Sequence, residues 1–128
     1  MATLLGGGGN GGASAYIATL LHGVTMAHMH HLMASSYAKH MALGDLYDDL
    51  NDKTDALAEA YMGCTGQKLT FTGGSVTLAA DPIADVQALY EYAERQRAAM
   101  GDESHVQNIV DEVCSVIASA LYKLRRLS

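Results

Sequence analysis

A chain of 128 residues has the length of one small domain, and 49% apolar residues with a single proline favour a compact helical core over disorder. Fourteen acidic residues against eight basic ones give a formal charge of -6, which disfavours a nucleic-acid surface, because such a surface gathers lysine and arginine. No apolar run reaches the roughly 18 residues of a membrane span, and the first residues lack the basic and apolar regions of a signal peptide.

Glycine dominates residues 6–12, and glycine loses the most backbone entropy on ordering. We therefore expect residues 1–13 to form a flexible arm, or one that orders only against a partner. A helix over about 14–33 follows, with Ser14 as its N-cap. One arc of this helix holds its apolar stripe together with two histidines: Ile17, Leu21, Val24, His28, His31 and Leu32. His22 and His30 are expected to point elsewhere.

A polar break at residues 34–37 separates this helix from a second one, predicted over about 38–62. Its apolar residues share one face: Leu43, Leu46, Tyr47, Leu50, Leu57 and Tyr61. An acidic stripe lies beside that face: Asp48, Asp52, Asp55 and Glu59. Most acidic residues of such a helix lie on its solvated face, and we expect this of Asp45, Asp49 and Asp52. Asp55 and Glu59 form a like-charged i, i+4 pair, whose repulsion a bound cation would reverse.

The pattern then changes to period two over about 68–79, with Gly73-Gly74 in the middle, which predicts a small β-hairpin. Asp81 and Pro82 are typical of a helix start, and we expect a third helix over about 82–100, ended by Gly101. A fourth helix is predicted over about 104–127, opened by a capping box of Ser104 and Gln107. Its inward face is apolar: Ile109, Val113, Val116, Ile117, Ala120, Leu121 and Leu124. The fold class is thus all-α, a four-helix bundle whose crossover between helices 2 and 3 carries the hairpin.

Cys64 and Cys114 show neither the spacing of a zinc ribbon nor that of a disulfide framework, so reduced, intracellular thiols are expected. The most informative chemical set is His28, His40, Asp55 and Glu59. Imidazoles and carboxylates together suit Fe(II) and similar divalent ions. No Glu-x-x-His motif occurs, so an iron site built from such motifs inside one bundle is not expected.

On the spacing of these four residues and the text around them (His28-Met29-His30-His31, Ala38-Lys39-His40, Asp55 to Glu59), the chain resembles the Dps branch of the ferritin-like proteins, above all small Dps-like proteins of bacteriophages. The resemblance covers about residues 14–63. It implies a ferritin-like bundle, a hollow homo-oligomeric shell, and Fe(II) oxidation by peroxide or oxygen. It also implies a site between two-fold related subunits, with His28 and His40 from one and Asp55 and Glu59 from the other. Additional candidate ligands are His31, Asp48 and Asp52.

The sequence departs from the family pattern in three places. Gly44 stands where the family usually has a further acid, and Met29 stands where a tryptophan is typical. An uncharged glycine arm replaces the basic tail through which some members bind DNA, so no direct nucleic-acid binding is expected. Three cations near the C-terminus suit the helix dipole better than a nucleic-acid patch: Lys123, Arg125 and Arg126.

Two other functions stay open. The bundle could serve as a structural protein of a phage particle that has lost catalysis, with residues 1–13 engaging neighbouring virion proteins. It could also be a helical interaction module whose histidines are merely packed. The expected location is accordingly the cytoplasm of a bacterial host or the virion.

Overall fold

The computed structural model describes residues 12–127, which form four α-helices and one short 3₁₀ helix. In chain order these are α1 Gly12–Met33, α2 Tyr37–Thr65, α3 Pro82–Arg95, η1 Arg97–Met100 and α4 Ser104–Arg126. The predicted arm over 1–13 falls outside the described residues except for Gly12 and Ala13, which begin α1. Within the described part, no helix has both the length and the apolar character that crossing a membrane requires.

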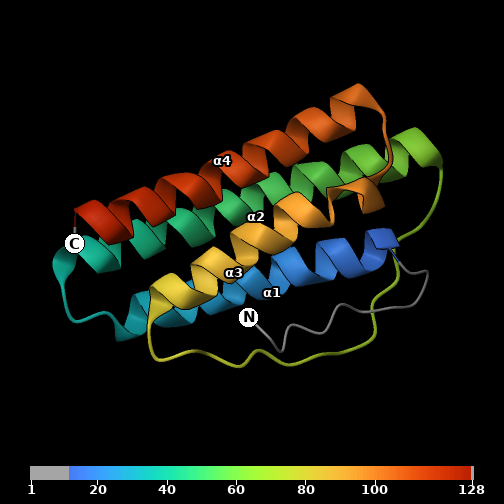
Figure 1. The fold of residues 1–128 in the computed structure, drawn as a ribbon. Coiled ribbons are helices and arrows are strands. Elements are labelled where there is room, and N and C mark those ends of the chain that lie inside the picture. Colours follow the sequence, from blue (N-terminus) through green and yellow to red (C-terminus); the bar gives the residue numbers. More distant parts are fainter. Residues whose placement is uncertain (1–11, 128) are drawn as a thin grey trace.

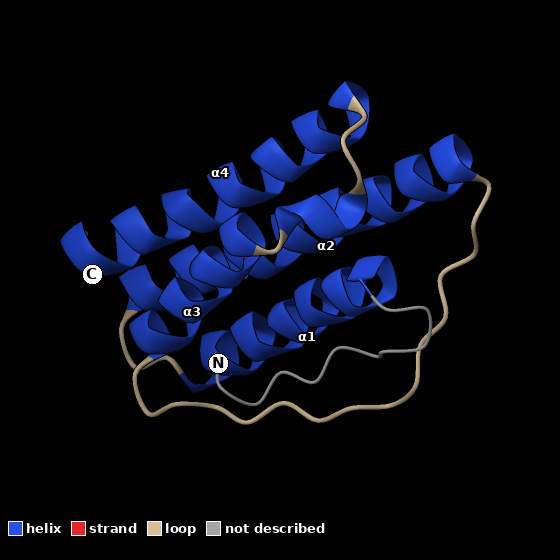
Figure 2. Cartoon of the chain, turned by 45° about the vertical axis from the view of Figure 1, so that its right-hand side comes forward, coloured by secondary structure: helices blue, strands red, loops and turns tan. Residues whose placement is uncertain are grey.

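The helices pack as two antiparallel pairs joined by one long connection (Figure 1). The three residues 34–36 turn the chain from α1 into α2, and Ser36 caps α2 by accepting a hydrogen bond from the Lys39 amide at 3.1 Å. α2 ends where Gly66 takes a left-handed conformation, with φ +71°. Residues 66–81 then run the length of the bundle, so that α3 starts at the end where α2 also starts (Figure 2). The resulting core joins all four helices.

The β-hairpin predicted over 68–79 is wrong, because no strand occurs within the described residues. The segment is instead extended and lies along the bundle, where Leu69, Val76 and Leu78 are half-buried against the core. A period-two pattern indicates that one side of an extended chain is apolar, but it does not show that the chain pairs with another strand. Helix surfaces cover that apolar side here, and the length of bundle that the connection must span leaves no residues for a return strand.

Most of the predicted faces of α2, α3 and α4 are confirmed. Leu43, Leu46, Leu50 and Leu57 of α2 are at most 1% exposed, and Tyr47 is half-buried. Asp81 caps α3, accepting from the amide of Ile83 at 2.9 Å, with Pro82 in the first turn. The core of the last two helices consists of Val86, Leu89, Ala93, Val110, Val113, Ile117, Ala120, Leu121 and Leu124. The sequence reading succeeds here because each helix buries a single stripe.

The predicted face of α1 is only partly confirmed: Ile17 is buried and Val24 is half-buried, but other members of the face are exposed. Leu21 is 38% exposed and Leu32 is 70% exposed, while Tyr16, Leu20 and Met26 are completely buried. α1 contacts α2 on one side and α3 on another, and the crossover covers a further part of its surface. Apolar residues lie on nearly every side of this helix, so its sequence did not determine which side would face the core.

Three predicted helix ends also need correction. Ser14 is not an N-cap: it is buried inside α1, and its Oγ accepts from the Thr70 amide of the crossover at 3.0 Å. α3 ends at Arg95, and the stretch to Met100 forms η1. The capping box is absent, because Gln107 bonds Arg97 and the Gly101 carbonyl instead. Ser14 and Gln107 therefore form hydrogen bonds with other parts of the fold instead of capping their own helices.

Candidate functional site

Two of the predicted ligands, His31 of α1 and His40 of α2, hold each other in place. The Nδ1–H of His31 donates to the His40 carbonyl at 2.7 Å, and the Nδ1–H of His40 donates to the His31 carbonyl at 3.0 Å. The two rings stack with centroids 3.8 Å apart and an interplanar angle of 23°. A carbonyl only accepts, so Nδ1 carries a proton in both rings, and in the neutral form of an imidazole with this tautomer Nε2 carries the lone pair.

His28 lies next to this pair but is held differently. Its ring stacks on Tyr47 of α2 at 4.0 Å between centroids and 10° between planes. The His28 and His31 rings are 6.1 Å apart. His28 is exposed, whereas His31, His40 and Tyr47 are half-buried. The structure therefore brings the three predicted histidines together in one aromatic cluster between α1 and α2.

Gly44 is the residue that gives His31 its room. A Cβ built on Gly44 would lie 3.0 Å from Cε1 and 3.1 Å from Nδ1 of His31, closer than carbon atoms normally approach. This contact accounts for the absence of a larger side chain at this position. The acid that the resemblance would place at residue 44 would require the His31 ring to shift by a few tenths of an ångström.

Gly44→Ala should therefore disturb the histidine pair. Alanine normally stabilises a helix interior by about 0.5–1 kcal/mol over glycine, and Gly63→Ala, which meets no atom within 4 Å, should show that gain. In Gly44→Ala, overpacking against the His31 ring should cancel this gain in stability. We therefore expect Gly44→Ala to be about 1 kcal/mol less stable than Gly63→Ala in urea unfolding. An equal increase in stability in both variants would show that the His31 ring moves aside without cost.

The predicted acidic ligands lie further along α2. Asp48, Asp52, Asp55 and Glu59 are all exposed. The fifteen residues from His40 to Asp55 correspond to about 22 Å along a helix axis. Within the described residues, no three His, Cys, Asp or Glu side chains come together in a way that could hold a metal ion. One chain by itself thus does not bring the predicted histidines and acids to a common point.

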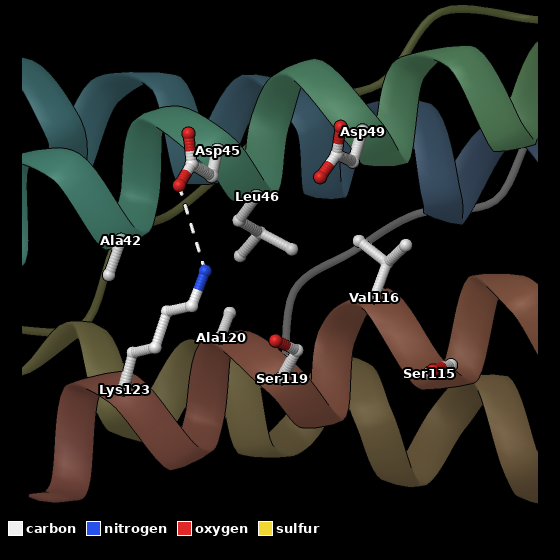
Figure 3. Close-up of a pocket in the computed structure, with 9 residues that line it drawn as sticks. All are labelled: Ala42, Asp45, Leu46, Asp49, Ser115, Val116, Ser119, Ala120 and Lys123. Atoms are coloured by element: carbon white, nitrogen blue, oxygen red, sulfur yellow. Dashed lines mark ion pairs between the residues drawn. The ribbon is translucent and has the colours of Figure 1, made fainter.

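Other acids of α2 serve its contact with α4. Asp45 pairs with Lys123 at 3.6 Å across a groove of about 170 Å³ between these helices, where Asp49 faces Ser115 and Ser119 (Figure 3). Further along, the Lys53 ammonium donates to Glu112 at 2.6 Å, and this hydrogen bond raises the pKa of Lys53. Asp45 and Asp49 are exposed, but Asp45 also pairs with Lys123 of α4, a contact that the prediction of a solvated surface did not include.

Sequence reasoning missed the buried pair formed by His30 and Asp85. Nε2 of His30 lies 2.8 Å from Oδ2 of Asp85, and each side chain is 3% exposed. The same carboxylate oxygen accepts from the amide of Ala79 at 2.8 Å, so it joins α1, α3 and the end of the crossover. The small residues Gly23 and Ala27, on the same side of α1 as His30, were the available signal that this side packs closely.

Neither cysteine is part of the histidine cluster. Cys114 is buried between α3 and α4, and burial together with the nearby Glu94 carboxylate raises the pKa of its thiol to about 12. A thiol with so high a pKa is almost never a thiolate at neutral pH and is therefore unreactive. Cys64 is exposed near the end of α2, and both thiols are free.

Residues 31–124 match the model of a family of unknown function, DUF5856. The chain belongs to this family. The match to DUF5856 begins at His31, covers His40, Asp55 and Glu59, and leaves His28 outside. No curated protein and no solved structure matches the chain.

Proposed function

We propose that this chain is a Dps-like iron-binding protein that holds Fe(II) between two copies of itself and oxidises it with peroxide or oxygen. His28 and His40 of one copy, together with His31, would bind the ion alongside Asp55 and Glu59 of the other. Two Fe(II) ions would each lose one electron, and one peroxide molecule would take up both. The oxidised iron would then be stored inside a homo-oligomeric shell.

The arrangement of His31 and His40 carries this proposal. Histidines that bind metals in proteins almost always donate their second ring nitrogen to a carbonyl or a carboxylate, which fixes the tautomer and the ring orientation. Both rings meet that condition, since each Nδ1–H is bonded to a backbone carbonyl and each Nε2 carries the lone pair in the neutral form.

The topology adds support. Two antiparallel helix pairs joined by a single lengthwise crossover are the connectivity that ferritin-like bundles use. Ferritin-like metal sites with Glu-x-x-His motifs lie inside one bundle, but here the described interior is filled mainly by apolar side chains, and the buried His30 and Asp85 are bonded to each other. A metal site of this chain would therefore be at the surface, where α1 and α2 expose the histidines and acids.

The separation along α2 favours a site between copies. In a two-fold contact, residue i of one copy meets residue j of the other, and j meets i. If His40 faces Asp55 and Glu59, the axis crosses α2 close to Asp48. Exposed acids of both copies, Asp48 and Asp52, would then approach each other, and bound cations would offset their repulsion.

The test is Fe(II) oxidation by peroxide, followed by absorbance, for the parent and for His40→Ala and Glu59→Ala. The matched control is Asp49→Ala, which removes an exposed acid of the same helix on the side facing α4. We expect both site variants to oxidise Fe(II) at the rate of the protein-free solution, and the control at the parental rate. A parental rate no faster than that of buffer would refute the proposal.

A second candidate is a structural role in a phage particle, with no catalysis. Exposed apolar side chains at the α1–α2 turn favour it: Met29, Leu32, Met33, Tyr37 and Met41, which are 43–78% exposed. Apolar residues gathered at one end of a helical bundle are typical of a surface that another protein covers. Homogeneous assembly without any iron-dependent activity would favour this function over the first.

A further inference from the structure

A second possible binding site lies at the opposite end of the α1–α2 face, under the crossover. It is a groove of about 280 Å³ formed by both helices and the extended segment after α2. The described residues lining it are Ile17, Leu21, Thr54, Asp55, Ala58, Met62, Leu69 and Phe71. A smaller hollow of about 180 Å³ adjoins it and shares Leu21 and Phe71. Phe71, which is 53% exposed, therefore stands between two hollows with little cover from the rest of the fold.

Thr54 is the uncharged polar residue of the groove lining. The residue is completely buried in α2, and its hydroxyl has no hydrogen-bond partner among the described residues. Leaving a buried hydroxyl unpaired is unfavourable, and most such groups in proteins are satisfied. Met62 lines the same groove, and its unbranched, flexible side chain can move to open access to the hydroxyl. A ligand with a hydrogen-bonding group at this depth would satisfy Thr54.

The Asp55 carboxylate favours a ligand whose hydrogen-bonding group is positively charged. This carboxylate is exposed at the groove, and no lysine or arginine occurs among the described residues of the lining. An anionic ligand would meet repulsion from this carboxylate, whereas a cation would pair with it. The remaining six side chains of the lining are apolar and offer a surface for a hydrocarbon body.

We propose that this groove binds a small amphipathic amine. The hydrocarbon part lies along the apolar side chains below Phe71, and the ammonium group donates to the Asp55 carboxylate and to the Thr54 hydroxyl. The site does not depend on the iron proposal. Because Asp55 is also a proposed iron ligand, however, amine and Fe(II) are expected to compete.

The test uses n-hexylamine on the metal-free protein, with hexanol and hexanoate as probes of the same chain length. Binding is followed by NMR, using the methyl signals of Ile17 and Met62. We expect hexylamine to shift both signals saturably. Hexanol should bind about threefold more weakly, since it lacks the contribution of an exposed ion pair, and hexanoate should not bind measurably.

Variants then test the two polar contacts and the groove itself. Asp55→Asn should weaken hexylamine binding about threefold, and Thr54→Val, which keeps the shape of the side chain, about fivefold. Ala58→Leu, which fills the groove, should abolish hexylamine binding. Asp49→Asn and His40→Ala should bind like the parent, which separates this site from the iron site. Equal binding of hexanoate, or binding unaffected by Ala58→Leu and Asp55→Asn, would overturn the proposal.

Discussion

Co-expressed in equal amounts, His40→Ala and Glu59→Ala subunits are expected to recover about a quarter of the parental Fe(II) oxidation rate, although each variant alone is inactive. In a mixed two-fold pair, one site lacks both residues, and the other keeps an intact histidine from one subunit and an intact glutamate from the other. Random pairing makes about half of the dimers mixed, with one working site each. The measurement is the initial absorbance change after peroxide addition.

The double variant His40→Ala/Glu59→Ala is the control, because it cannot form an intact site in any pairing. It should stay at the rate of buffer whether it is expressed alone or with either single variant. No recovery in the mixed preparation would mean that both residues act within one chain. Since the nineteen residues from His40 to Glu59 separate them by about 28 Å along the helix axis within one chain, that result would remove the shared-ion proposal altogether.

Asp85→Ala is expected to lower the free energy of unfolding by about 3–5 kcal/mol, the cost of breaking a buried pair by removing one partner. The substitution leaves the His30 ring buried without its acceptor and leaves the Ala79 amide without its bond. The end of the crossover and the start of α3 should loosen together. Urea unfolding followed by circular dichroism gives the loss of stability, and hydrogen exchange at Ala79 locates it.

Two comparisons sharpen this prediction. Asp52→Ala removes an exposed carboxylate and should change stability by no more than about 0.5 kcal/mol. The double variant His30→Leu/Asp85→Leu replaces both partners with apolar groups and should recover the part of the loss that comes from the unpaired His30 ring, while the Ala79 amide stays without its bond. If Asp85→Ala unfolds at the same urea concentration as Asp52→Ala, the buried pair does not stabilise the fold.

How much of the fold the sequence predicts varies with the helix. α2 alternates a narrow apolar stripe with acids, so its buried face follows from the 3.6-residue period alone, and Leu43 to Tyr61 lie where the pattern predicts. Asp81 and Pro82 mark the start of α3 through strictly local bonds. These features depend on residues that are close together in the chain, so they can be predicted from the sequence.

The candidate site divides in the same way. The sequence and its family resemblance singled out His28 and His40, with His31 as an additional candidate, and the structure brings these three rings together. Their spacing could not show that Nδ1 of His31 and of His40 would each bond the other residue's carbonyl, because those bonds join different helices. Nor could it show that Gly44 makes the room for His31.

The sequence by itself determined that the chain is helical, where its helices begin and end to within a few residues, and which face of α2 is buried. Only the tertiary structure decided which side of α1 faces the core, that residues 66–81 form a crossover without strands, and that His30 and Asp85 pair in the interior. The reason is physical. Helix period and capping act within a few residues, whereas burial of an evenly apolar helix and pairing of polar groups depend on surfaces that only the folded bundle brings together.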